Sequence, residues 1–189
     1  MPMIIDIQNL PIEGRTLTYS KKPESFKVLR SLSEKGECRF SDPLAIELTV
    51  LPERNLIRVD GSITTTIEQA CSRCVVDFES RLERRFTLRF SRESEASQPK
   101  NQNPELELTE EHIGLTLFTG ETIDFTDSVQ EQVVLALPYK PLCSQDCKGL
   151  CPRCGTDLNT GRCNCAQEQS RNPFAVLGNL DWPSQRKEK

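Results

Sequence analysis

The sequence predicts a mainly antiparallel α+β protein, with a β-rich domain over residues 1–140 and a cysteine-rich appendage over residues 141–189. Three observations predict it. Apolar and polar residues alternate between about residues 44 and 90, as they do in half-buried strands. A helical pattern follows over residues 126–137 and leads into the appendage. Six of the nine cysteines then fall within residues 142–165.

The alternation predicts a long antiparallel hairpin followed by a third strand. From Pro43 to Gln69 the sequence reads PLAIELTVLPERNLIRVDGSITTTIEQ, with a turn expected at PERN. The third strand begins after the pair Cys71 and Cys74, so this pair lies in a turn between two strands. The residues expected on the inner face are Leu44, Ile46, Leu48, Val50, Ile57, Val59, Ile63, Thr65, Ile67, Val76, Phe78, Leu82, Phe86, Leu88 and Phe90.

The elements after the third strand are shorter. Residues 91–105 are polar and contain prolines, which is typical of a flexible loop, and short strands are expected over residues 113–125. A helix over residues 126–137 would begin with a capping box and end at Pro138. The box would pair Asp127 with Gln130 or Ser128 with Glu131. One more short helix is expected in NPFAVLGNL, residues 172–180.

The cysteine spacing indicates metal binding. No export signal or apolar run long enough to cross a membrane is visible, so we expect a cytoplasmic protein whose thiols stay reduced, and a disulfide framework is disfavoured. Gaps of two residues let a chain bend so that both thiolates reach one tetrahedral ion. Eight cysteines suit two structural zinc ions, and we pair them as follows: Cys71, Cys74, Cys143 and Cys147 in one site; Cys151, Cys154, Cys163 and Cys165 in the other.

Other uses of the thiols are weaker alternatives. The spacing from Cys147 to Cys154 is similar to that of the cluster loop of radical S-adenosylmethionine enzymes, but no repeated strand and helix units precede it. An iron–sulfur protein would be brown and contain iron with little zinc. Cys38 remains outside both sets and is expected to be a small buried apolar residue.

Charge and the scarcity of catalytic patterns favour a binding protein. The formal net charge is −4 and no phosphate-binding glycine loop occurs. The single histidine, His112, lies far from every cysteine, which gives no support to Cys–His catalysis. One local run of cations, interrupted by Glu83, lies on the outward face of the third strand. The candidate contacts to RNA or to a partner protein are Arg73, Arg81, Arg85 and Arg89, although an ordinary solvated strand face is the favoured interpretation of those on the strand.

The motif order adds a family resemblance. CSRC between two strands, LALPYKPLCSQDCKGLCPRCGTDLNTGRCNC and NPFAVLGNL together resemble the YceD family of large ribosomal RNA subunit accumulation proteins. The resemblance implies a non-enzymatic role in ribosome biogenesis, in which the protein keeps the 23S ribosomal RNA at normal levels. Its partners would be a large-subunit precursor or a ribosomal protein, and the acidic net charge does not indicate direct contact with RNA. No membrane partner is implied. The alternative from another functional class is a zinc- or redox-responsive regulatory or adaptor protein.

Overall fold

The computed structural model describes residues 2–93 and 114–165. The chain forms two compact units, Met1–Cys147 and Lys148–Lys189. The expected helix over residues 172–180, most of the expected loop, and His112 lie outside the described residues. Among the described residues, no helix is both long enough and apolar enough to span a membrane.

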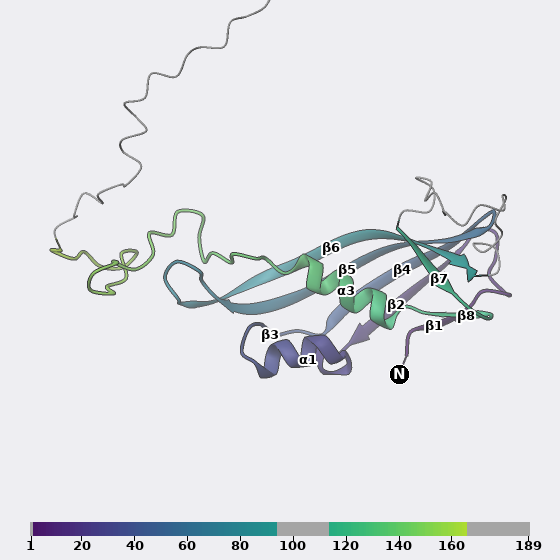
Figure 1. The fold of residues 1–189 in the computed structure, drawn as a ribbon, viewed down its shortest axis with the longest axis horizontal. Helices are drawn as coiled ribbons and strands as arrows, with labels where there is room; N and C mark the ends of the chain where they lie inside the picture. The colour runs from purple at the N-terminus through teal and green to yellow at the C-terminus, as the bar shows by residue number, and fades with distance from the viewer. Residues whose placement is uncertain (1, 94–113, 166–189) are drawn as a thin grey trace, which may run out of the picture. The chain divides into compact units, whose positions relative to one another are not determined.

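The larger unit is built on a mainly antiparallel sheet of six strands (Figure 1). A second sheet pairs β1 (Ile4–Asp6) with β8 (Thr122–Asp124). Only β6 and β7 pair in parallel among the strands of the larger sheet. Its strand order is β2 (Arg15–Lys21), β4 (Leu44–Glu53), β5 (Leu56–Ala70), β6 (Asp77–Arg92) and β7 (Leu115–Phe118), with β3 (Arg39–Phe40) pairing additionally with β5.

The sheet has one buried face and one solvated face, as the alternation predicts. All four apolar residues expected on β4 are at most 2% exposed, and Phe90 on β6 is also buried. The expected inward residues of β6 include partly exposed ones, and Val76, which lies before the strand, is 50% exposed. At the middle of β5, Gly61 lies opposite Phe86, whose ring occupies the space that a side chain at Gly61 would need. The two residues together fill one position of the core.

Two helices cover the buried face of the sheet. Leu29 on α1 (Lys27–Glu34) is fully buried in the core, together with Val129 and Val133 on α3 (Thr126–Ala136). Helix α3 contacts both β6 and α1. A short 3-10 helix, Pro23–Ser25, precedes α1.

Helix α3 matches the expected helix in extent but begins differently. Neither of the expected capping boxes forms at its start, because the helix begins at Thr126, with Phe125 at the N-cap and no side-chain cap. The Thr126 backbone N–H instead donates a hydrogen bond of 2.9 Å to Asp124. The carboxylate that satisfies this N–H therefore comes from the preceding strand.

Candidate metal centres

The first cysteine pair lies in the turn between β5 and β6, where the backbone fixes both thiols. The backbone N–H of Val75 donates to the Cys71 carbonyl at 2.9 Å, and the backbone N–H of Cys71 donates to the Val76 carbonyl at 2.9 Å. Val75 has φ of 61°, a left-handed conformation that is unusual for a β-branched residue. This turn places the Cys71 and Cys74 side chains on one side, facing residues from the end of the same unit.

Two hydrogen bonds join the turn to the segment that carries the next two cysteines. The backbone N–H of Ser72 donates to the Pro141 carbonyl, and Nη1 of Arg73 donates to the Cys147 carbonyl, each at 2.8 Å. The Sγ atoms of Cys71 and Cys147 are 3.8 Å apart. Residues far apart in the sequence are thus held side by side.

The sulfur positions fit a tetrahedral thiolate centre. The Sγ atoms of Cys74 and Cys143 are 3.6 Å apart, and all four sulfurs lie within 4.8 Å of one another. Sulfurs bound at about 2.3 Å to one tetrahedral ion are separated by about 3.8 Å. Hard cations prefer oxygen ligands, whereas four thiolates suit a soft or borderline ion such as zinc. Cys71, Cys74, Cys143 and Cys147 would hold it.

This first centre is largely closed to solvent. Cys71, Cys74 and Cys147 are at most 4% exposed, and they pack against Phe78 and Leu142. Cys143 is the exposed member of the set. Four protein ligands in a closed site leave no position for water, which is typical of a structural ion.

The second cysteine set lies in the smaller unit and repeats the turn of the first. The backbone N–H of Gly155 donates to the Cys151 carbonyl at 2.9 Å, and the backbone N–H of Cys151 donates to the Thr156 carbonyl at 2.8 Å. Gly155 has φ of 72° and takes the position that Val75 takes in the first turn. Its lack of a side chain makes the left-handed conformation inexpensive here.

The second set also brings four sulfurs together, but with greater exposure. The sulfurs of Cys151, Cys154, Cys163 and Cys165 all lie within 4.8 Å of one another. Cys151 is buried, Cys154 is exposed and the other two are half-buried. The two centres therefore share their ligand chemistry and differ in their protection from solvent.

The pKa values of the thiols show that the cysteines of each set influence one another's ionisation. Backbone hydrogen bonds, first that of Cys143, lower the pKa of Cys71 to about 6, while the neighbouring side chains of Cys74 and Cys147 raise the pKa of Cys143 to about 12. In the second set, hydrogen bonds with Thr156 lower the pKa of Cys154 to about 6, and Cys154 in turn raises the pKa of Cys165 to about 12. Adjacent thiols cannot all ionise without a cation among them.

The remaining cysteine and three of the four candidate arginines lie outside both centres. Cys38 is 2% exposed within the main core, as the sequence predicts, and burial raises the pKa of its thiol. Arg81, Arg85 and Arg89 lie on the solvated face of β6, whereas Arg73 belongs to the first centre.

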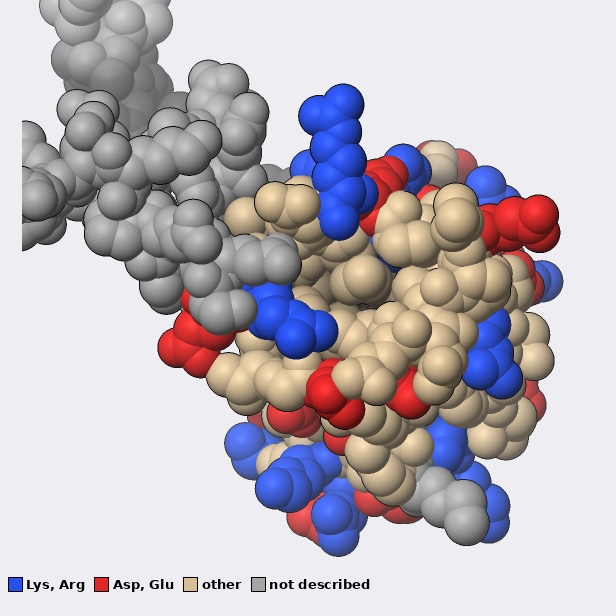
Figure 2. Space-filling model, turned by 90° about the vertical axis from the view of Figure 1, so that its right-hand side faces the viewer, with Lys and Arg blue, Asp and Glu red and all other residues tan. Residues whose placement is uncertain are grey.

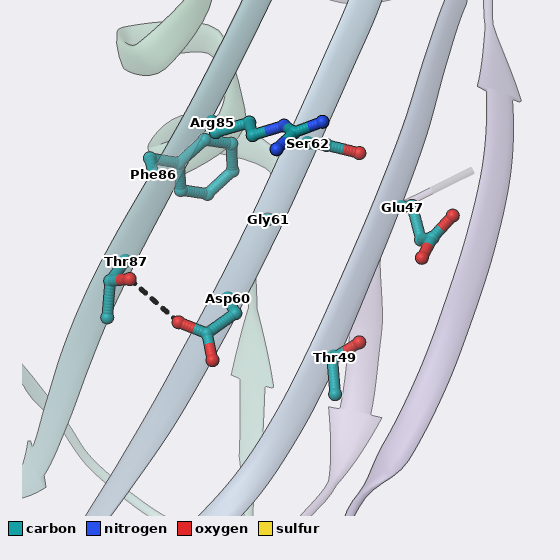
Figure 3. Close-up of a pocket in the computed structure, with 8 residues that line it drawn as sticks. All are labelled: Glu47, Thr49, Asp60, Gly61, Ser62, Arg85, Phe86 and Thr87. Atoms are coloured by element: carbon teal, nitrogen blue, oxygen red, sulfur yellow. Dashed lines mark hydrogen bonds between the residues drawn. The ribbon is translucent and has the colours of Figure 1, made fainter.

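Carboxylates lie among the cations of the solvated face. Arg81 and Glu83 form an ion pair with an N–O distance of 2.6 Å. Figure 3 shows Arg85 directed across β5 past Ser62, on a surface that also carries Glu47 and Asp60. On the end of the molecule drawn in Figure 2, lysines and arginines are likewise interspersed with acidic residues. The arginines of β6 therefore do not form a surface of one sign.

Comparison with known proteins places the chain in a family. The sequence model described as "Large ribosomal RNA subunit accumulation protein YceD" matches residues 59–181, a range that includes both cysteine sets. A chloroplastic YCED homolog 1 of Arabidopsis thaliana is 25% identical over 198 residues, which cover 93% of this chain and 60% of the relative. The homolog of the same name from Zea mays is 23% identical over 147 residues, covering 65% of this chain and 48% of the relative.

Bacterial relatives are also found. An uncharacterized protein of Mycobacterium tuberculosis is 29% identical over 115 residues, which cover 61% of this chain and 51% of the relative. The chain thus spans about half to three fifths of the length of these relatives. No solved structure matches significantly. The family match confirms the resemblance seen in the motifs, and the chain belongs to the YceD family of large ribosomal RNA subunit accumulation proteins.

Proposed function

We propose that the protein is a non-enzymatic factor in the biogenesis of the large ribosomal subunit, needed for the accumulation of 23S ribosomal RNA. The observation that carries this proposal is the family match over residues 59–181, together with the name of the relatives as large ribosomal RNA subunit accumulation proteins. The closed four-thiolate geometry of the first centre supports a structural role for its cysteines rather than a catalytic one.

We further propose that both centres hold zinc. Zinc is the common borderline metal for closed sites with four thiolate ligands, and the sulfur separations of 3.6 and 3.8 Å fit its bond length. Metal analysis of the purified protein tests this, with two zinc ions per chain expected. A brown protein with iron in place of zinc would contradict it.

The ratio of 23S to 16S ribosomal RNA in cells depleted of the protein tests the function. We expect a selective fall of the large species, restored by the wild-type chain. The protein could act on a large-subunit precursor by direct contact with RNA or by holding a ribosomal protein. Co-purification with ribosomal precursors that survives nuclease treatment supports the protein-mediated route, and loss on nuclease treatment contradicts it. An unchanged ratio on depletion would refute the role in large-subunit biogenesis.

The exposure of the second centre favours one other candidate function, a zinc-releasing redox response. Cys154 is exposed, so oxidants in solution reach its sulfur, and oxidation of a ligand thiolate would release the ion. Mild peroxide should then release one zinc ion, detected with a chromogenic indicator, whereas the ion of the largely closed first centre should stay bound. Retention of both ions under peroxide at physiological doses would contradict the regulatory function.

A further inference from the structure

A small cleft lies beside the first metal centre, where the β5–β6 turn meets the segment before Cys143. Ser72 and Arg73 from the turn line one wall, and Tyr139, Lys140 and Leu142 line the other. The hydrogen bond from Ser72 to Pro141 joins the two walls. The shape of this cleft therefore depends on the same contacts that bring the first cysteine set together.

The cleft presents an aromatic ring to solvent. Tyr139 is 93% exposed, a large fraction for an aromatic side chain in a folded unit. Lys140 Nζ lies 6.0 Å from the centre of this ring. Exposed aromatic rings close to cations are the platforms on which proteins stack unpaired bases.

Its charge differs from that of the rest of the described surface near β6. The five described lining residues include two cations and no carboxylate, whereas on the solvated sheet face Arg81 lies against Glu83. The hydrogen bond to the Cys147 carbonyl orients the Arg73 guanidinium and uses one of its five N–H donors. The adjacent centre, with four thiolates and one divalent ion, would carry a net charge of −2, so Arg73 and Lys140 are the groups that would hold an anion at this cleft.

We propose that this cleft binds an unpaired stretch of RNA, with a base stacked on Tyr139 and the adjoining phosphates held by Arg73 and Lys140. A ring with cations beside it matches the alternation of base and phosphate along a single strand, whereas in duplex RNA the base faces are already stacked. The inference rests on the proposed function, for which it names the surface that contacts ribosomal RNA.

Fluorescence anisotropy of the zinc-loaded full chain with labelled single-stranded RNA of about 12 nucleotides tests the proposal directly. Tyr139→Ala should weaken binding about tenfold, while Tyr139→Phe should retain most of the affinity because stacking uses the ring. Lys140→Ala should reduce the slope of log affinity against log salt by about 0.7, the value for one lost phosphate contact.

Lys21→Ala is the matched control, because Lys21 also lies over a tyrosine ring, that of Tyr19, but far from the cleft in the sequence. It should leave the affinity unchanged. Zinc content and melting temperature of each variant report whether the fold persists. If Lys140→Ala changes zinc retention and not RNA affinity, the cations serve the metal centre and the proposal fails.

Three further results would overturn the proposal: no binding by the wild type, equal affinity of Tyr139→Ala and wild type, or equal binding of duplex RNA. Complementation of depleted cells separates this from the proposed function. If wild type and Tyr139→Ala both restore the 23S to 16S ratio, the cleft proposal fails and the function stands. If depletion leaves the ratio unchanged, the proposed role in large-subunit biogenesis is wrong. The anisotropy measurements alone then decide whether the cleft binds RNA.

Discussion

Loss of the first metal centre should destabilise the larger unit far more than loss of the second. In Cys71→Ser, one thiolate ligand is removed from a centre that links residues separated by 76 positions in the sequence. If the ion acts as a cross-link in the unfolded chain, a loop of this length contributes about 4.5 kcal/mol to the free energy of unfolding. For a chain of this size that corresponds to a fall in melting temperature of roughly 10–15 °C.

Cys163→Ser is the matched control for this experiment. It removes a ligand of the same type from the smaller unit, where the ion would close a loop of roughly 15 residues worth about 3 kcal/mol. Far-UV circular dichroism, which is dominated by the sheet of the larger unit, should therefore report a large shift for Cys71→Ser and almost none for Cys163→Ser.

Chelation distinguishes the metal from the packing of the side chain. Metal-free wild type should melt close to metal-free Cys71→Ser, because both lack the cross-link. Equal melting temperatures of zinc-loaded wild type and Cys71→Ser would refute the reasoning. A shift that persists in full after chelation would assign the effect to burial of the serine hydroxyl instead.

Three other changes have defined outcomes. Gly61→Val should destabilise the protein by about 1–3 kcal/mol, because its Cβ would overlap the Phe86 ring; thermal melting measures this, and failure of Phe86→Leu to restore stability in the same chain would contradict it. Val75→Gly should raise zinc affinity and melting temperature by relieving about 1 kcal/mol of left-handed strain, and a lower melting temperature would argue against strain at this residue. Zinc affinity of the first centre should rise with pH between 6 and 8. At pH 7 without an ion, the Cys71 thiol with its pKa of about 6 is mostly ionised, whereas the Cys143 thiol with its pKa of about 12 must release a proton to bind the ion. Chelator competition at pH 6 and pH 8 measures the zinc affinity. Equal affinities at the two pH values would refute this prediction.

The strands of the sheet were predictable because one face is buried and the other is solvated. Period-two alternation is visible only in that situation, and it identified β4, β5 and β6 nearly to their ends. The cysteine spacing predicts two sets of four, and the sulfurs of the same two sets lie within 4.8 Å of one another; that each set holds an ion stays a prediction.

Elements near the N-terminus were not predicted, since their stability comes from tertiary contacts. Helix α1 has eight residues, too few to be stable alone, and it buries only Leu29. Among the described strands, β2 pairs with β4 alone, and its apolar residues Leu17 and Tyr19 are only partly buried. The alternation of Leu17 and Tyr19 was the one available signal. The cleft residue Tyr139 was missed because exposure of an aromatic residue leaves no trace in a periodic pattern.

The position of the first centre connects stability to the proposed contact with RNA. Pairing between β4 and β5 ends at Thr64, so within the described residues the last part of β5 has only β6 and the two residues of β3 as partners (Figure 1). A ribbon of two strands is only marginally stable in water. An ion that joins the end of this ribbon to Cys143 and Cys147 would hold both walls of the cleft in place. Chelation should therefore weaken RNA binding although no residue of the cleft is changed. RNA binding that survives complete metal removal would show that the cleft does not depend on the first metal centre.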